Sequence, residues 1–329
     1  MTTLARTFIS HQLSALILGL ATAMSVHAQG VAYVSSEKDN ALTLIDMKTL
    51  AVTGTLATCK RPRHLLRSPD GKQLMTACGD SNQADVIDIA SGKSARKIPL
   101  GDDPEAFDLS PDAKTLYVSN EEEGALSFVD AATGKITASV KVGKEPEGVK
   151  VSADGKTVYV TSEAANLVHV IDTASAKLTH NIKVGKRPRR FALTPDGAQL
   201  WVSNELDASL SIIDTKSHTV TGTVKFEVKG MRASDITPVG LVMTRDGKRA
   251  FVSLGRANHL AFVDVASRKV TDLVLVGKRA WNVALNKAET QAWVVNGLSD
   301  DLTVIDIASA KPLKTLAVGR VPYGVVLVE

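Results

Sequence analysis

The chain has 329 residues, of which 44% are hydrophobic, 22% are charged and only 4% are aromatic. This composition is typical of a folded globular protein and argues against intrinsic disorder, collagen and coiled coil. A formal charge of +4 does not by itself indicate a polyanion-binding protein, and two cysteines cannot form an iron–sulfur cluster or a four-cysteine zinc site.

The first 28 residues have the pattern of a secretory signal peptide. Arg6 precedes the apolar stretch 13–26, and Val26 and Ala28 lie three and one positions before a cleavage point. We therefore expect cleavage after Ala28 and a periplasmic mature chain. No later stretch approaches the roughly 20 apolar residues that a membrane-spanning helix needs, so we expect no membrane span in residues 29–329.

A 42-residue repeat organises the rest of the chain. A hydrophobic run that ends in Asp recurs at intervals of 42, 42, 42, 42, 50 and 42 residues, and an aromatic residue or Met lies 13 positions before each Asp. Two landmarks that share one spacing and one eight-residue insertion indicate seven repeats. The repeated residues are Asp46, Asp88, Asp130, Asp172, Asp214, Asp264 and Asp306.

Each repeat contains four segments with the period-two alternation of β-strands. In one repeat, strands are expected at 148–151, 158–161, 167–171 and 178–184, and a tight turn at 153–155. Four antiparallel strands in about 40 residues make one blade of a β-propeller, whereas a helical repeat would show a period of 3.6 residues.

The two ends of the chain predict a closed ring. Residue 31 begins what is elsewhere a second strand, and the chain stops after residues 323–328, which are elsewhere a first strand. One blade must therefore combine the C-terminal strand with the three N-terminal strands, which removes two exposed sheet edges. We predict an all-β fold, with residues 29–329 forming a single seven-bladed β-propeller domain of four-stranded antiparallel blades. We expect it to be a monomer.

The second strands and the linkers between blades resemble the YVTN repeat family over about residues 31–329. The matching segments include 117–120 (YVSN), 201–204 (WVSN) and the linker 142–146 (VGKEP), whereas 75–78 (MTAC) and 251–254 (FVSL) lack the Asn of the pattern. A secreted chain made of seven such repeats is similar to the propeller proteins associated with PQQ-dependent alcohol catabolism. This resemblance implies a periplasmic, non-catalytic accessory protein that works beside quinoprotein dehydrogenases.

Two repeated features have a structural interpretation. The Asp that ends each third strand should accept backbone N–H groups in the turn that follows, contributing about 1 kcal/mol each. The aromatic residues of the second strands, such as Tyr117 and Trp201, should pack between blades.

The two cysteines lie at unusual positions of the repeat. Cys59 replaces the Gly of a linker, and Cys78 replaces the Asn that ends a second strand. These two positions should be side by side on one rim of an antiparallel blade. In an oxidising compartment we predict a disulfide between them, and two unpaired thiols are the alternative.

Motifs for metal, haem or nucleophilic chemistry are absent from the mature sequence. Its five histidines are isolated, and it has no C-x-x-C-H, no G-x-S-x-G and no phosphate-binding loop. Seven blades and three tryptophans also fit poorly with the quinoprotein dehydrogenases, which are eight-bladed. We expect no metal and no cofactor, and no redox activity with PQQ.

Charged and aromatic residues gather on the rim that carries the linkers into the first strands. Basic segments at 60–64 and 186–190 flank acidic segments at 102–105 and 121–123. The position two after the linker Pro is small in most blades but is His64 and Arg190 in two of them, and Asn282 has the aligned position in a third. We predict a ligand or partner mouth near the central channel, with solvated loop charges as the alternative. The candidate binding residues are Arg61, Arg63, His64, Glu105, Glu147, Arg187, Arg189, Arg190, Trp281, Asn282 and Tyr323.

The insertion falls in the linker 225–238 and carries Phe226, Met231 and Arg232. Insertions in propellers map to loops, often on the binding face. This segment is either a set of contact residues or an inert loop.

Our first functional hypothesis is a non-catalytic periplasmic binding or scaffold protein. Its partner would be a protein or a small molecule of quinoprotein-linked alcohol oxidation. If the charged rim is the binding surface, replacing Arg63, Arg189 and Arg190 together by Ala should weaken binding and leave the melting temperature nearly unchanged.

The alternative hypothesis is a lactonase-like or other hydrolase with its site at the channel mouth, for which His64, Glu105 and Glu147 are the candidate residues. Nucleic-acid binding is not expected, because acidic loops interleave with the basic ones and few aromatic residues are available for stacking on bases.

Overall fold

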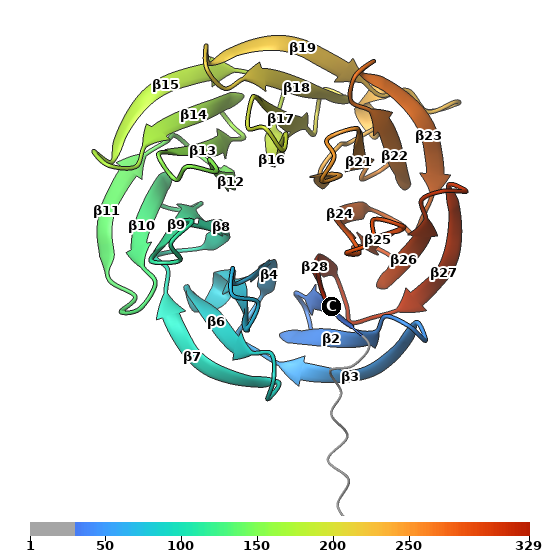
Figure 1. The fold of residues 1–329 in the computed structure, drawn as a ribbon, viewed down its shortest axis with the longest axis horizontal. Coiled ribbons are helices and arrows are strands. Elements are labelled where there is room, and N and C mark those ends of the chain that lie inside the picture. Colours follow the sequence, from blue (N-terminus) through green and yellow to red (C-terminus); the bar gives the residue numbers. More distant parts are fainter. Residues whose placement is uncertain (1–29) are drawn as a thin grey trace, which may run out of the picture.

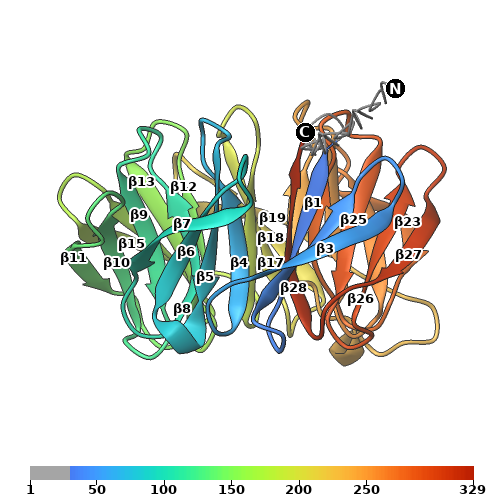
Figure 2. The ribbon, with the colours of Figure 1, turned by 90° about the horizontal axis from the view of Figure 1, so that it is seen from below.

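The fold is a ring of seven four-stranded antiparallel sheets around a central axis (Figure 1), which confirms the predicted seven-bladed propeller. The computed structural model describes residues 30–329, so the predicted signal peptide, residues 1–28, lies outside the described residues. In side view the strands of each blade run between the two faces of a disc (Figure 2). Within residues 30–329, no helix combines the length and the hydrophobicity that crossing a bilayer requires.

The blades are numbered in chain order, and the strands of each blade are given from the axis outward. Blade 1 contains β28 (Pro322–Val328), β1 (Val31–Ser36), β2 (Ala41–Asp46) and β3 (Ala51–Ala57). Blade 2 contains β4 (Pro62–Arg67), β5 (Gln73–Cys78), β6 (Gln83–Asp88) and β7 (Lys93–Pro99). Blade 3 contains β8 (Pro104–Leu109), β9 (Thr115–Asn120), β10 (Ala125–Asp130) and β11 (Ile136–Lys141). Blade 4 contains β12 (Pro146–Val151), β13 (Thr157–Ser162), β14 (Leu167–Asp172) and β15 (Lys177–Lys183).

The remaining three blades follow the same order. Blade 5 contains β16 (Pro188–Leu193), β17 (Gln199–Asn204), β18 (Ser209–Asp214) and β19 (Thr219–Lys225). Blade 6 contains β20 (Leu241–Met243), β21 (Arg249–Ser253), β22 (His259–Asp264) and β23 (Lys269–Leu275). Blade 7 contains β24 (Ala280–Leu285), β25 (Gln291–Asn296), β26 (Asp301–Asp306) and β27 (Lys311–Ala317). Two short 3-10 helices, η2 (Gly79–Ser81) and η3 (Ala233–Asp235), lie in loops.

The ring closes because the last strand of the chain pairs with the first. β28 runs antiparallel to β1, and Val31 is opposite Val328 while Tyr33 is opposite Val326. Arg320 also pairs with Asp39 across this junction, with 2.6 Å between Nε and Oδ1. Blade 1 is therefore built from both ends of the chain, as the sequence predicts.

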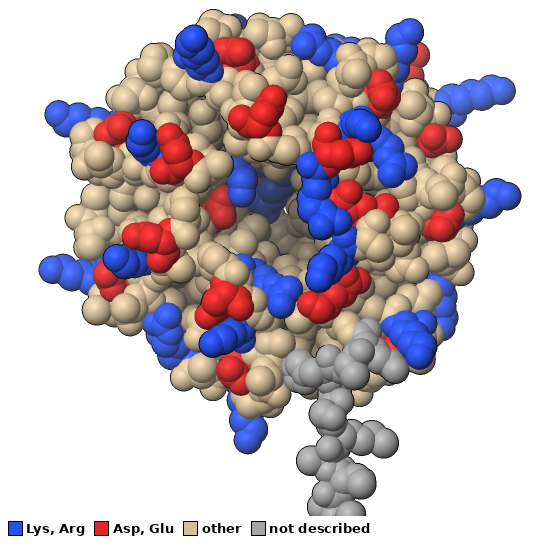
Figure 3. Space-filling view, viewed as in Figure 1, with Lys and Arg blue, Asp and Glu red and all other residues tan. Residues whose placement is uncertain are grey.

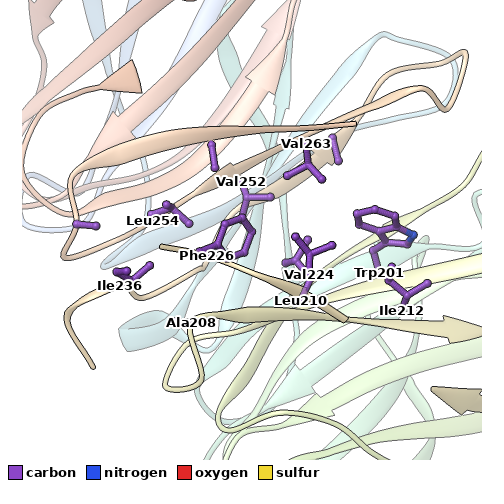
Figure 4. Packing of buried hydrophobic residues seen from close by; sticks show 13 residues of the cluster. Trp201, Ala208, Leu210, Ile212, Val224, Phe226, Ile236, Val252, Leu254 and Val263 are labelled. Carbon is purple, nitrogen blue, oxygen red and sulfur yellow. The ribbon is translucent and has the colours of Figure 1, made fainter. Parts of the chain in front are cut away.

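The apolar core is divided into clusters between adjacent blades. Figure 4 shows the cluster between blades 5 and 6, in which Trp201 and Val224 pack with Val252 and Val263. Tyr117 has the equivalent role between blades 3 and 4. The aromatic residues of the second strands therefore pack between blades, as predicted.

The Asp that ends each third strand caps the turn that follows it. Asp46 Oδ1 accepts the backbone N–H of Thr49 at 2.7 Å, and Asp172 Oδ1 accepts that of Ser175 at 2.8 Å. The repeated Asp is a turn residue, which confirms its structural interpretation.

A hydroxyl group in the second strand holds each of five blades to the next blade. Ser119 Oγ in blade 3 donates to the carbonyl oxygen of Glu147 in blade 4 at 2.8 Å, and Thr161 Oγ1 donates to that of Arg189 in blade 5 at 3.1 Å. Equivalent bonds join Ser35 to Arg63, Ser203 to Val239 and Ser253 to Trp281. The Ser or Thr of the repeat thus fixes the backbone of a residue that the next blade presents near the axis.

The insertion in the linker between blades 5 and 6 is partly a core element. Phe226 is only 2% exposed and packs in the cluster between these blades (Figure 4), whereas Met231 is 36% exposed. Arg232 pairs with Asp235 at 2.8 Å within the same loop. The hypothesis of a contact set is therefore wrong for Phe226, whose ring is already covered.

Cys59 and Cys78 form a disulfide in blade 2, and their Cα atoms are 5.8 Å apart. The bond joins the linker before β4 to the end of β5. It therefore constrains the segment from which Arg61 and Arg63 enter the channel.

Replacing both cysteines by Ser should lower the free energy of unfolding by roughly 3 kcal/mol, because the bond restricts a loop of about 20 residues in the unfolded chain. Urea-induced unfolding of the wild type and of C59S/C78S without reductant measures the difference. Wild type in the presence of reductant is the control and should match the variant. A variant as stable as the oxidised wild type would contradict the prediction.

Candidate functional site

The candidate site lies where the first strands of the seven blades converge on the axis. Each first strand runs from the face that carries the linkers, such as residues 142–146, to the face that carries the turns, such as residues 195–197. We name these the linker face and the turn face. The turn face, on which β28 ends, is nearer the reader in Figure 1 and Figure 3.

A buried ion-pair network closes the linker end of the channel. At its centre, Glu147 lies 3.2 Å from Arg189 and 2.9 Å from Arg190, and it accepts a hydrogen bond of 2.9 Å from the Tyr323 hydroxyl. Burial alone would raise the pKa of Glu147, but Arg189, Arg190 and Arg63 hold this pKa below its ordinary value, so the carboxylate is ionised. The network consists of Arg61, Arg63, Arg187, Arg189, Arg190, Arg279, Glu105, Glu147, Glu163 and Glu205.

Glu105 anchors the basic segment of blade 2. Its side chain is fully buried, lies 2.6 Å from Arg61 and also contacts Arg63. Asp103 and Glu121 are near enough to Glu105 for the three carboxylates to hold a metal ion. Arg61 is also 2.9 Å from Asp103, so a guanidinium group already supplies positive charge to this cluster. We assign no metal to it.

Two glutamates that the sequence analysis did not select complete the network. Glu163 bridges Arg187, at 2.8 Å, and Arg189. Glu205 bridges Arg187, at 3.0 Å, and Arg279, at 2.9 Å. Both glutamates directly follow a second strand and therefore lie on the linker face, which is the signal that could have identified them.

Two aromatic rings pack against the arginines of the network. The Arg63 guanidinium lies 4.3 Å from the ring centroid of Tyr323, and that of Arg279 lies 4.7 Å from the ring centroid of Trp281. Cation–π contacts of this kind stabilise buried guanidinium groups. Burial raises the pKa of Tyr323 to about 12, so its hydroxyl keeps its proton and donates it to Glu147. Tyr323 is thus buried and is not an exposed anchor for a partner, and Trp281 is half-buried with Arg279 packed against its ring.

These contacts correct the expectation that the charged residues of the linker face form an accessible binding rim, and they also differ from the alternative of solvated loop charges. The side chains of Arg63, Arg189 and Arg190 are only 13%, 5% and 10% exposed, and each has a carboxylate partner. Replacing all three by Ala would leave the charge of the buried Glu147 carboxylate without these partners. Because such unpaired charges are strongly destabilising, the expectation of an unchanged melting temperature is wrong.

A cavity of about 190 Å³ lies between the ion-pair network and the turn face. His64, Arg190 and Asn282 line it, together with the ion pair of Asp108 and Lys150, whose Oδ2 and Nζ atoms are 2.7 Å apart. Figure 3 shows the hollow at the ring centre and the Lys and Arg side chains around it. The three residues that depart from the small side chain of the repeat therefore meet in one cavity.

Close approach of the blades explains why other repeats keep Gly at this position. A Cβ atom on Gly148 would lie 2.1 Å from the carbonyl oxygen of Arg189, and one on Gly240 would lie 2.4 Å from that of Trp281. A side chain at either position would therefore displace the next blade.

His64 is electrically neutral at neutral pH. It lies deep in the channel, where its ring is accessible only from the cavity side and packs edge-to-face on Phe107 with 5.2 Å between centroids. Burial lowers the pKa of His64 to about 3, and the positive charge of Arg190 acts in the same direction. The unprotonated imidazole can therefore accept a proton from a molecule in the cavity.

Arg190 and Asn282 each use only part of their hydrogen-bonding capacity on the protein. Arg190 binds Glu147 and the Tyr323 hydroxyl through its terminal nitrogens, but its buried Nε has no partner among the described residues. Asn282 Nδ2 donates to the carbonyl oxygen of Tyr323 at 2.8 Å. In blade 7, Val295 occupies the second-strand position at which five other blades have the Ser or Thr that binds the next blade. The Asn282 bond therefore replaces the missing hydroxyl bond between blades 7 and 1. The Asn282 amide oxygen remains for a ligand, whereas the Arg190 Nε–H is enclosed by protein.

A larger cavity, of about 390 Å³, lies away from the axis between blades 1 and 2. Tyr33, Ile89 and Val328 give it a mainly apolar lining. Its lining contains neither a histidine nor any of the candidate binding residues that we predicted from the sequence. The axial cavity is therefore the candidate site.

The fold and the site together define a seven-bladed β-propeller with a cavity on its axis. A family model described as a YNCE-like beta-propeller matches residues 104–191, which span blades 3 and 4. No curated protein gives a significant match to the chain.

Solved structures of very different origin share the fold. The periplasmic gluconolactonase of Pseudomonas aeruginosa is 21% identical, with a TM-score of 0.77 over 91% of this chain and 99% of that chain. Hydrazine synthase of Kuenenia stuttgartiensis is 22% identical, with a TM-score of 0.73 over 87% and 94%. A Bacteroides uniformis protein provisionally described as a 6-phosphogluconolactonase is 13% identical, with a TM-score of 0.76 over 91% and 100%. At these identities the likeness establishes the fold alone.

Replacing Glu147 by Gln should lower the free energy of unfolding by about 3 to 5 kcal/mol, because Arg189 and Arg190 lose a buried counter-charge. Chemical unfolding of the variant measures the loss. The matched control is E122Q, since Glu122 is exposed and its replacement should change stability by less than about 0.5 kcal/mol. Equal stabilities of E147Q and E122Q would show that the network contributes nothing.

Proposed function

We propose that the chain is a lactone hydrolase whose active site is the axial cavity. The observation that carries this proposal is that a neutral imidazole, His64, and a guanidinium group, that of Arg190, line the same cavity. Hydrolysis of an ester needs a proton acceptor for the attacking water and a donor for the oxygen that becomes negative. The likeness in fold to a gluconolactonase supports the proposal.

The roles follow from the two groups. Water attacks the carbonyl carbon of the lactone while His64 takes one of its protons. The positive charge of Arg190 stabilises the carbonyl oxygen, on which negative charge develops. The ring C–O bond then breaks, and the leaving alkoxide takes the proton from His64, so that one lactone and one water give one hydroxy acid. Because a low pKa makes His64 a weak base, its substrate should be an ester as reactive as a lactone.

The two glutamates that the sequence proposes for a hydrolase are not suited to this role. Glu105 and Glu147 are bound by arginines on the far side of the cavity lining, and neither lines the cavity. Of the three residues proposed for a hydrolase, His64 is the one that lines the cavity.

The second candidate function is the one that the repeat resemblance implies, a non-catalytic periplasmic accessory of quinoprotein-linked alcohol catabolism. The pairing of both carboxylates with arginines favours it, because the cavity then has a single, weakly basic group. The disulfide suits an oxidising compartment in either case. Under this second hypothesis the same cavity would bind its ligand without turnover.

Turnover of a panel of lactones by the purified chain 29–329 distinguishes the two functions. The replacement His64→Asn should reduce kcat/KM by about 100-fold or more, because it removes the proton acceptor. The control is His180→Asn, since His180 is exposed on an outer strand and its loss should leave kcat/KM unchanged. Absence of any turnover, or an H64N variant as active as H180N, would refute the hydrolase proposal.

The pH dependence of kcat/KM provides a further check. A histidine with its ordinary pKa of about 6.5 would lose activity as the pH falls below that value. The pKa of His64 is lowered to about 3, so His64 stays unprotonated through the whole interval between the two values. The profile should be flat from pH 7 down to about pH 5, where circular dichroism can verify that the chain stays folded. An acid limb centred near pH 6.5 would contradict the assignment of His64.

A further inference from the structure

The lining of the axial cavity is apolar over much of its circumference. Its hydrocarbon groups come from five of the seven blades, so they surround a ligand and do not form a single patch. They are Leu66, Ala106, Phe107, Val149, Phe191 and Leu241.

The polar groups of the lining have little capacity left for a ligand. Asp108 accepts the Lys150 ammonium group and the backbone N–H of Val151 at Oδ2, and that of Leu109 at Oδ1. Neither Asp108 oxygen is therefore without a partner. Within residues 30–329, the lining side chains that keep hydrogen-bonding groups without a protein partner are His64, Arg190, Asn282 and Lys150, whose ammonium group uses one of its three N–H groups.

The proposed reaction already uses two of these groups. His64 faces the attacking water and Arg190 faces the carbonyl oxygen, so the Asn282 amide oxygen and two N–H groups of Lys150 are left for the four hydroxyl groups of a sugar lactone. A glucono-δ-lactone carries four hydroxyl groups, each of which donates and accepts a hydrogen bond. Placing such hydroxyls against hydrocarbon without partners costs about 1 to 3 kcal/mol for each group.

The size of the cavity also limits the ligand. Its volume of about 190 Å³ is below the roughly 300 Å³ at which pockets for drug-sized ligands begin. A single five- or six-membered ring with a short substituent is the class of molecule that this volume admits.

We infer that the cavity selects small lactones whose ring carries hydrocarbon substituents and rejects polyhydroxylated sugar lactones. This inference rests on the proposed function. It gives this chain a different class of substrate from that of the gluconolactonase that shares its fold. The apolar lining supplies affinity by covering the hydrocarbon part of the ring. The selectivity comes from the hydroxyl groups of a sugar lactone, for which the lining has too few partners.

The test compares kcat/KM for δ-hexalactone and glucono-δ-lactone, two six-membered lactones, after subtraction of spontaneous hydrolysis. We expect a preference of about 100-fold for δ-hexalactone, the size of discrimination found where a pocket cannot satisfy a hydroxyl group. Equal rates, or a preference for glucono-δ-lactone, would overturn the inference and leave the hydrolase proposal standing.

Leu241→Asn tests the cause of the selectivity, because it adds an amide to the apolar lining at similar volume. The preference for δ-hexalactone should fall at least several-fold in L241N. The matched control is Leu313→Asn, since Leu313 is 51% exposed on an outer strand, and it should keep the wild-type preference. An unchanged ratio in L241N would show that the lining does not set the selectivity.

Binding of unreactive lactam analogues keeps the inference testable if the chain hydrolyses no lactone. Isothermal titration calorimetry gives the dissociation constants of the lactams that correspond to δ-hexalactone and glucono-δ-lactone. Tighter binding of the alkyl lactam, weakened in L241N and not in L313N, would support the inference even though the hydrolase proposal had failed. Tighter binding of the sugar lactam, or no binding of either, would overturn it.

Discussion

Closure of the ring by the pairing of β28 with β1 is the constraint on which the rest of the structure depends. It forces seven first strands to meet at one axis, and it brings together residues that are far apart in the chain. The hydrogen bond of Tyr323 to Glu147 spans 176 positions, and the contact of Arg190 with Tyr323 spans 133. These two contacts link the ion-pair network across the axis, whereas its ion pairs join residues that are nearer in the chain.

Charge balance then decides which end of the channel is accessible. A buried charge costs several kcal/mol unless it is paired, and each glutamate of the network binds at least two arginines. This mutual pairing fills the linker end with side chains. Nearer the turn face half of the lining residues have apolar side chains, and the hydrogen-bonding capacity that remains there belongs to His64, Arg190, Asn282 and Lys150.

Departures from the repeat mark both the structural and the functional features of the axis. Most blades join the next blade through a Ser or Thr hydroxyl of the second strand, but blade 7 has Val295 at this position. Asn282, on the first strand of the same blade, binds the carbonyl oxygen of Tyr323 in its place. The same Asn282 lines the cavity, so one substitution in the repeat serves the fold and the site together. The proposed hydrolase chemistry likewise depends on His64 and Arg190. These two residues occupy the repeat position at which other blades have a small residue, such as Gly148 or Gly240.

The sequence alone determined the number of blades, the order of strands, the closure of the ring and the positions at which large polar residues replace small ones. These features follow from short-range patterns, namely a period of two within strands and a constant spacing between repeats. Only the tertiary structure decided that Glu105 and Glu147 are paired and buried, that Glu163 and Glu205 complete the network, and that the cavity opens toward the turn face. Each of these outcomes depends on distances between side chains in different blades. Those distances are set by the curvature of the closed ring, for which no local segment carries a signal.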